Sequence, residues 1–332
     1  GGVVTLCSAL SIAEIASNIP RAGGLYTYLE ELYGEKWGFL LGWVQSVISY
    51  PASVAAQGIA FATYASFFLP KSFGESVVAM TGLALAVMLF VLVMNVLSTR
   101  CGGFIQVAAT VGKLIPIVAI LGIGLFSGVA PGANGMSMIL IGGGKENIGA
   151  AILSTLWAYD GWIGVTNLAG EMKAPKKNLP RALTIGGIII VAVYIFYYIG
   201  VAGGATNQAL IDVGATVAFT NIFGGVLGNI LNLFIAISCM GTLNGLMMAC
   251  SRGMYSLASR GEGIKPQVFS QVDSQTNMPH NSSVLALVIT AAWFLYFYMA
   301  NLSGIWTGIF VFDSTELPII TIYLMYLPML VQ

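Results

Sequence analysis

Long apolar stretches constrain this chain more than any other feature of its sequence. About 20 consecutive apolar residues are enough to cross the hydrocarbon core of a bilayer as one helix. The run from Leu83 to Met94 is apolar at consecutive positions, unlike the alternating pattern of a membrane β-barrel. We therefore expect an all-α integral membrane protein with about nine transmembrane helices, at residues 1–18, 37–69, 76–98, 103–128, 148–169, 182–203, 222–250, 282–300 and 317–331.

The composition excludes a soluble protein. Of 332 residues, 57% are hydrophobic and only 8% are charged, against roughly 25% charged residues in an ordinary soluble domain. The 13 basic and 13 acidic residues cancel, so the charge balance does not indicate a nucleic acid partner. The four cysteines lack the Cys-x-x-Cys spacing of a metal or redox site, and we expect neither a metal nor a cofactor.

The loops expected on the two sides of the membrane differ sharply in their number of basic residues. Cytoplasmic loops of membrane proteins carry the excess of Lys and Arg. One set of loops holds ten of the 13 basic residues, the other holds Lys71 and Lys145, and Lys113 lies in no loop. The first set is therefore predicted to be cytoplasmic, and it comprises Arg21, Lys36, Arg100, Lys173, Lys176, Lys177, Arg181, Arg252, Arg260 and Lys265.

This orientation makes the first apolar stretch run from the outside inward, and the first residue is Gly1 rather than Met. Both observations lead us to expect at least one further helix upstream of Gly1. We expect a cell-membrane protein, the inner membrane in a bacterium, that crosses the bilayer several times.

Lys113 lies about ten residues into the stretch 103–128, which is about 15 Å into a core of roughly 30 Å. A charge at that depth costs about 2.5 to 3.5 kcal/mol on insertion scales, so it requires a partner or a function. One interpretation is a structural lysine bonded to neighbouring helices. The other is an ammonium that replaces a coupling cation or carries a transported proton.

Asp160 lies about twelve residues into the stretch 148–169, within the run Trp157-Ala-Tyr-Asp-Gly-Trp162. A carboxylate followed by Gly161 weakens the helical hydrogen bonding, and irregular backbone at that depth is tolerated only where it is buried or lines a wet cavity. We expect a broken helix whose exposed ends bind a zwitterion. The alternative is a continuous helix in which Asp160 is paired with a neighbour.

Several long motifs resemble amino acid permeases of the amino acid, polyamine and organocation superfamily. The run from Ala9 to Gly34, followed by Trp37-Gly-Phe-Leu-Leu-Gly-Trp43, is similar to their second and third helices. Trp157 to Trp162, with the run from Gly170 to Ala182, resembles the sixth helix and following loop of the L-type exchanger branch. Leu243-Asn-Gly, with Ser251-Arg and Arg260, is similar to the eighth helix of that branch.

The resemblance implies a LeuT-type fold, in which helices one to five and six to ten form an inverted repeat around a central site. The nine segments would match family helices two to ten within a single transporter domain, 1–332. Residues 1–128 would be the remainder of the first repeat and 148–331 the second. The helix expected upstream of Gly1 would be the family's first, which carries a Gly-rich break for the substrate carboxylate.

The resemblance also implies functional positions. Trp157, Ala158, Tyr159 and Gly161 would form the substrate half-site around Asp160, with backbone carbonyls meeting the substrate ammonium and Trp157 acting as an aromatic gate. Lys113 matches the fifth-helix lysine whose amine occupies the second sodium site of sodium-coupled relatives. Ser238 and Tyr194 match positions near that amine or the adjacent site.

The resemblance also bears on partners. Animal relatives pair with a single-span heavy chain through a Cys between the third and fourth helices. The corresponding loop, 69–76, contains no Cys, so no disulfide-linked heavy chain is expected; the partners expected are the amino acid substrate and the bilayer.

The predicted function is sodium-independent exchange of small neutral amino acids by alternating access. The alternatives are a proton-coupled symporter that uses Lys113, and an exchanger of cationic amino acids or polyamines that uses Asp160. An integral membrane enzyme would need clustered His, Cys or acidic residues, and a channel a selectivity ring or Gly-rich filter. Neither pattern is present in the sequence.

Overall fold

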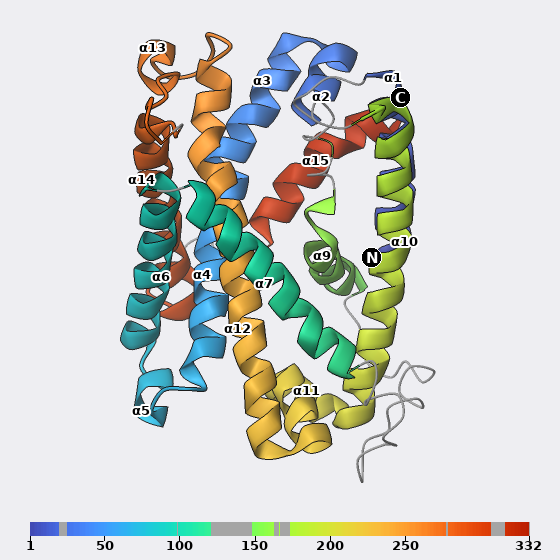
Figure 1. Cartoon of the computed structure of the whole chain (residues 1–332), viewed down its shortest axis with the longest axis vertical. Coiled ribbons are helices and arrows are strands. Elements are labelled where there is room, and N and C mark those ends of the chain that lie inside the picture. Colours follow the sequence, from blue (N-terminus) through green and yellow to red (C-terminus); the bar gives the residue numbers. More distant parts are fainter. Residues whose placement is uncertain are drawn as a thin grey trace.

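The fold is taken from a computed structural model of the chain. It describes residues 1–19, 25–97, 99–120, 148–162, 166, 173–276, 278–306 and 316–331, and these contain helices and connecting turns but no strand. The main helices, labelled in Figure 1, are α1 (Gly2–Asn18), α2 (Leu25–Tyr33), α3 (Glu35–Val44), α4 (Tyr50–Ser66), α6 (Val77–Leu97), α7 (Thr99–Ala119), α9 (Ile148–Tyr159), α10 (Pro175–Gly204), α12 (Ala215–Ala258), α14 (His280–Phe297) and α15 (Leu317–Val331). Short elements connect them: α5 (Lys71–Gly74), α11 (Asn207–Val213), α13 (Pro266–Phe269) and the π-helical turns η1 (Gln45–Ser49) and η4 (Tyr298–Leu302).

Each of the nine predicted segments contains a helix in the described part of the chain. Six helical stretches there are long and apolar enough to cross a bilayer, namely 35–66, 77–97, 102–119, 175–204, 215–258 and 280–302. The other three, α1, α9 and α15, are shorter than a full span as described. The all-helical membrane class is therefore confirmed, while only six segments reach full spanning length.

The helices form two groups. In one group, α1 packs along α10 and contacts α9. In the other, α4, α6, α12 and α14 surround an apolar core that includes Val54, Met88, Met247 and Phe294, and α7 lies along α12. In Figure 1, α10 stands on one side of the molecule and α6 with α14 on the other. The site described below lies where these groups meet.

The long segment 35–66 contains a π-helical turn, η1, directly before Pro51. A proline lacks the N–H that would bond to the carbonyl four residues earlier, and its ring crowds that carbonyl. The carbonyl concerned is that of Val47, and it accepts a hydrogen bond from the indole N–H of Trp293 at 2.7 Å instead. The long apolar segment is therefore irregular just before Pro51, at this wide turn.

The helix α12 is longer than the predicted 222–250 and consists of two parts. Gly224 has φ 79° and ψ 167°, which separates residues 215–223 from the long helix that follows. That second part continues to Ala258 and lies against α4 and α7 for much of its length.

The basic loops lie together at one end of the molecule. The starts of α3 and α10, the final turns of α12 and the short helix α13 all lie at the end that is uppermost in Figure 1. This end carries Lys36, Lys173, Lys176, Lys177, Arg181, Arg260 and Lys265. The short helix α5, which begins at Lys71, lies at the opposite end. We refer to the basic end as the cytoplasmic end, in accordance with the positive-inside rule.

Candidate functional site

A cavity of about 120 Å³ lies where α9 ends, between the two groups of helices. At roughly 10 to 15 Å³ for each water-sized occupant, this volume accommodates several waters or a small polar molecule. Its walls come from five parts of the chain far apart in sequence: Leu25, Tyr26, Gln45, Ser49, Tyr50, Ser53, Asp160, Gly161, Thr166, Leu246, Pro318, Ile322 and Tyr326.

The described part of the predicted segment 148–169 ends its helix next to Asp160, where the break was predicted. The helix α9 ends at Tyr159, the N–H of Asp160 donates to the carbonyl of Trp157 at 3.2 Å, and Gly161 has φ 94°. An L-residue with a side chain is strained at that angle, whereas glycine is not. Gly161 therefore allows the chain to leave the helix here. Residues 163–165 and 167–169 of the predicted segment lie outside the described part of the chain.

Asp160 provides the only carboxylate among the cavity-lining residues. Its side chain is exposed in this hollow, and no Lys or Arg in the described ranges forms an ion pair with it. The hydroxyl-bearing residues Ser49, Tyr50, Ser53 and Tyr326 line the same cavity. A negative charge among hydroxyl groups can bind an ammonium or another organic cation through charge-assisted hydrogen bonds.

Tyr194 of α10 is brought against the end of α9. Its hydroxyl donates to the carbonyl of Ala158 at 2.8 Å, and its ring meets that of Tyr159 edge-on with 4.8 Å between centroids. One of the carbonyls expected to face a substrate ammonium thus already has a donor. Trp157 is 43% exposed, and it lies outside the cavity lining.

Lys113 and Ser238 lie on the neighbouring helices α7 and α12. These helices approach closely: a Cβ atom at Gly241 would lie 2.2 Å from that of Ala109, and one at Gly112 would lie 3.4 Å from Ile237. Lys113 is half-buried, and it forms no ion pair within the described ranges. Neither residue lines the cavity, so of the eight predicted site residues only Asp160 and Gly161 do so.

Comparison with known proteins identifies the family. The sequence profile described as amino acid permease matches residues 1–331. The chain belongs to the amino acid permease family. This family consists of transporters, not enzymes, and the permease is a membrane protein with several spanning helices, placed in the cell membrane.

Individual relatives are exchangers and transporters of amino acids. The permease is 41% identical over 263 residues to the serine/threonine exchanger SteT of Bacillus subtilis, covering 78% of this chain and 58% of that protein. It is 31% identical over 287 residues to the human b(0,+)-type amino acid transporter 1, covering 84% and 58%. It is 29% identical over 300 residues to the human Asc-type amino acid transporter 1, covering 87% and 55%. The chain thus spans little more than half the length of these relatives.

Sequence reasoning missed most of the cavity wall of this permease. Ser49 ends η1 and Ser53 lies four residues further on in α4, so both face the same side of this continuous helical stretch. The spacing of two serines by four residues in an otherwise apolar segment could have predicted that these residues face a polar cavity. Tyr326 gave no such signal, because α15 is apolar on every side of it and Tyr323 is the only other aromatic residue of the helix.

Proposed function

We propose that this permease exchanges small neutral amino acids across the membrane by alternating access and without sodium. The observation that carries the proposal is the cavity walled by the helix interruption at Asp160 and Gly161. Interrupted helices supply unpaired backbone groups at mid-membrane, where a zwitterion needs partners that lipid cannot offer. The kinship with a serine/threonine exchanger supports the substrate class.

In this proposal Trp157, Ala158, Tyr159, Asp160 and Gly161 form the substrate half-site, and Trp157 covers the bound amino acid. Tyr194 orients the end of α9 through its hydrogen bond to Ala158. The carbonyls beyond Ala158, together with the Asp160 carboxylate, face the substrate ammonium. The cavity hydroxyls of Ser49 and Ser53 are further acceptors for it.

Sodium independence is proposed from Lys113. An ammonium fixed near Ser238 supplies the positive charge that a bound sodium ion would otherwise supply between α7 and α12. The half-buried position of Lys113 and the close approach of these two helices support this role.

We also propose that the nine helices correspond to family helices two to ten in a LeuT-type inverted repeat. Residues 1–128 then belong to the first repeat and 148–331 to the second. The grouping of α1, α9 and α10 against α4, α6, α12 and α14 supports this arrangement. No disulfide-linked heavy chain is expected, since the loop around α5 has no cysteine.

The experiment is reconstitution of the natural full-length gene product into liposomes. Uptake of labelled serine is measured with and without unlabelled serine inside, in sodium and in choline buffer. Exchange without sodium coupling requires internal amino acid and gives equal rates in the two buffers. Uptake into empty liposomes at the same rate, or dependence on sodium, would contradict the proposal.

A second candidate substrate class is cationic amino acids or polyamines. Asp160 favours it, because its carboxylate is exposed in the cavity and forms no ion pair with a described residue. In this case labelled arginine exchanges and serine does not, and Asp160→Asn abolishes arginine exchange. A neutral exchanger shows the opposite preference.

Proton-coupled symport through Lys113 is the remaining alternative, and Lys113→Met distinguishes the two mechanisms. An exchanger that needs a fixed positive charge loses turnover at every pH. A proton symporter instead keeps some uptake but loses its dependence on pH.

A further inference from the structure

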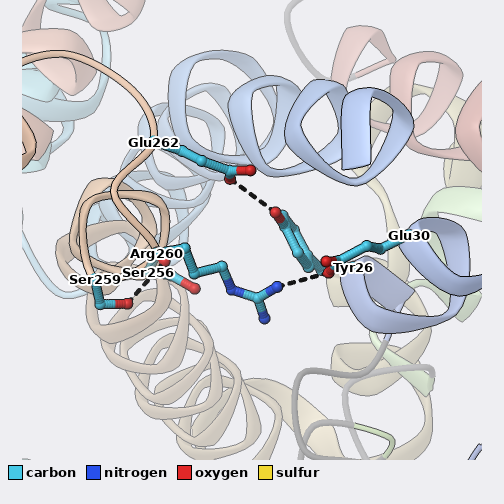
Figure 2. A network of polar contacts seen from close by, with 6 residues as sticks. All are labelled: Tyr26, Glu30, Ser256, Ser259, Arg260 and Glu262. Atoms are coloured by element: carbon cyan, nitrogen blue, oxygen red, sulfur yellow. Dashed lines mark hydrogen bonds and ion pairs between the residues drawn. The ribbon is translucent and has the colours of Figure 1, made fainter. Parts of the chain in front are cut away.

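Four charged and aromatic side chains join α2 to the chain that follows α12 at the cytoplasmic end. Figure 2 shows Tyr26 lying between Arg260 and Glu262, with Glu30 beside Arg260. The Tyr26 hydroxyl donates to Glu262 Oε2 at 2.8 Å, and Arg260 Nη1 donates to Glu30 Oε2 at 2.8 Å. The Arg260 guanidinium carbon lies 3.7 Å from the centre of the Tyr26 ring. We call these four residues the Tyr26 network.

The Tyr26 ring also lies against two glycines of α3. A Cβ atom at Gly42 would lie 3.2 Å from Cδ2 of the ring, and one at Gly38 would lie 3.4 Å from its Cζ. Because neither glycine has a side chain, the ring lies directly on the helix backbone. Tyr26 is only 8% exposed, so its position is fixed by Arg260 and α3 at the ring and by Glu262 at the hydroxyl.

The turn after α12 is shaped to present Arg260 and Glu262 together. Gly261 and Gly263 both have φ 81°, a conformation that residues with side chains rarely adopt. The N–H groups of Arg260 and Glu262 both donate to the carbonyl of Leu257, each at 3.1 Å. The alternation of glycine with a charged residue lets both charged side chains reach α2.

The Tyr26 hydroxyl remains a donor at neutral pH. Burial, followed by the hydrogen bond to Glu262, raises the pKa of Tyr26 to about 12, although the positive charge of Arg260 opposes this change. The network therefore holds one cation and two carboxylates around a neutral phenol.

Tyr26 also lines the cavity that contains Asp160 and Gly161. One residue is thus shared by the cytoplasmic part of the cavity wall and the network that links α2 to the end of α12. We propose that Tyr26 is a positioning residue for the cytoplasmic wall of the substrate cavity, held there by Glu262 and Arg260. The network thereby sets the affinity of the cavity for substrate that arrives from the cytoplasm.

This inference rests on the proposed exchange function. Loosening the network frees the Tyr26 ring to enter or leave the cavity on the cytoplasmic side. The helix α2 lies at the cytoplasmic end of the molecule, so we expect the external KM to depend little on the Tyr26 network.

The test measures KM for serine separately on the two faces of oriented proteoliposomes that contain the full-length gene product. Tyr26→Phe removes only the hydroxyl, and Glu262→Ala removes only its acceptor. Each is expected to raise the cytoplasmic KM about fivefold, the loss that one hydrogen bond of ordinary strength gives. The external KM should change by less than about twofold.

Three further variants separate positioning from general damage. Tyr28→Phe is the matched control, because Tyr28 lies on the same helix, is fully buried, has no hydroxyl partner in the described residues and does not line the cavity. It should leave both KM values unchanged. Glu262→Gln keeps an acceptor for the phenol and should restore most of the affinity. The Y26F/E262A double variant should be no worse than either single variant, because both remove the same hydrogen bond.

Equal changes of KM on the two faces, or no change in either variant, would overturn the inference. Failure of the proposed function is a different result, namely a wild-type protein that does not exchange. In that case the cavity wall is tested without transport. The native cysteines are replaced by serine, and a single cysteine is introduced in the cavity by Ser53→Cys. Tyr26→Phe should change the labelling rate by a charged thiol reagent from the cytoplasmic face alone, and an unchanged rate would overturn the inference.

Discussion

The indole N–H of Trp293 in α14 donates to the carbonyl of Val47 in the π-helical turn η1 at 2.7 Å. This carbonyl is the one that Pro51 leaves without its usual helical donor, so a residue 246 positions away compensates for a local defect. Trp293→Phe should destabilise the permease by about 1 to 3 kcal/mol, the cost of an unsatisfied buried carbonyl. Thermal unfolding in detergent measures this loss.

A double-mutant cycle with Pro51→Ala tests whether Trp293 compensates for the N–H that Pro51 lacks. Alanine at position 51 restores a backbone N–H that can bond to Val47, so Trp293→Phe should cost less in that background. Trp306→Phe, at a tryptophan that is 43% exposed, serves as the control and should have little effect. An equal cost of Trp293→Phe in both backgrounds would refute the explanation.

Asn244 links three helices in the buried core. Its side-chain amide donates to the carbonyl of Gly102 at 3.0 Å and to Gln106 Oε1 at 3.2 Å, while its Oδ1 accepts from Asn95 at 2.8 Å. Asn244→Ala should destabilise the protein by about 2 to 3 kcal/mol, because it leaves several buried polar groups without partners. Asn229→Ala changes an exposed asparagine of the same helix and should be nearly neutral. Similar unfolding temperatures for the two variants would contradict this role.

Gly161→Ala tests the backbone conformation at the helix interruption. A Cβ atom there would meet nothing within 4 Å, so any cost arises from φ 94° rather than from crowding. We expect destabilisation of about 1 to 2 kcal/mol together with slower exchange. Gly82→Ala is the control, because that glycine is in regular helix and also has open space. It should be neutral or stabilising by up to about 1 kcal/mol. A neutral Gly161→Ala would show that the interruption does not require glycine.

Asp273 orders the loop before α14. Its Oδ2 accepts hydrogen bonds from the N–H of Thr276 at 2.8 Å, from the Thr276 hydroxyl at 2.9 Å and from the N–H of Gln275 at 3.1 Å. These bonds, the Thr276 N–H first, hold the pKa of this carboxyl below its ordinary value of 3.8. A lowered pKa stabilises the folded loop above pH 3.8, and the stabilisation is lost as the pH falls through the lowered pKa.

The corresponding measurement is the mobility of a spin label at Ser274. Mobility should be low at neutral pH, rise only once the pH falls below 3.8, and be high under both conditions in Asp273→Ala. Asp212→Ala removes a carboxylate that accepts from Gln208 in α11, at the opposite end of the molecule. The label should not respond to that change. A label equally mobile at neutral pH in the wild type and in Asp273→Ala would contradict the prediction.

The sequence was a good guide to features that depend on neighbouring residues. Each predicted apolar segment contains a helix, the basic loops gather at one end, and the helix ends where Gly161 follows Asp160. It was a poor guide to the cavity, since Tyr26, Tyr50 and Tyr326 were not predicted to line it. Ser238 was assigned by resemblance and Lys113 by its depth in the membrane as well, and their proposed role remains a prediction.

Hydropathy, loop charge and glycine placement by themselves predicted that this protein is helical and spans a membrane, in which direction it does so, and that a helix ends at Asp160. These are local properties, because bilayer thickness and backbone sterics act on consecutive residues. Only the tertiary structure decided which faces of the helices meet, as in the bond between Tyr26 and Glu262, which are 236 positions apart. The physical reason is that lipid tails and apolar side chains are equally good surroundings for an apolar helix face, so hydropathy does not distinguish the lipid-facing side from the packed side.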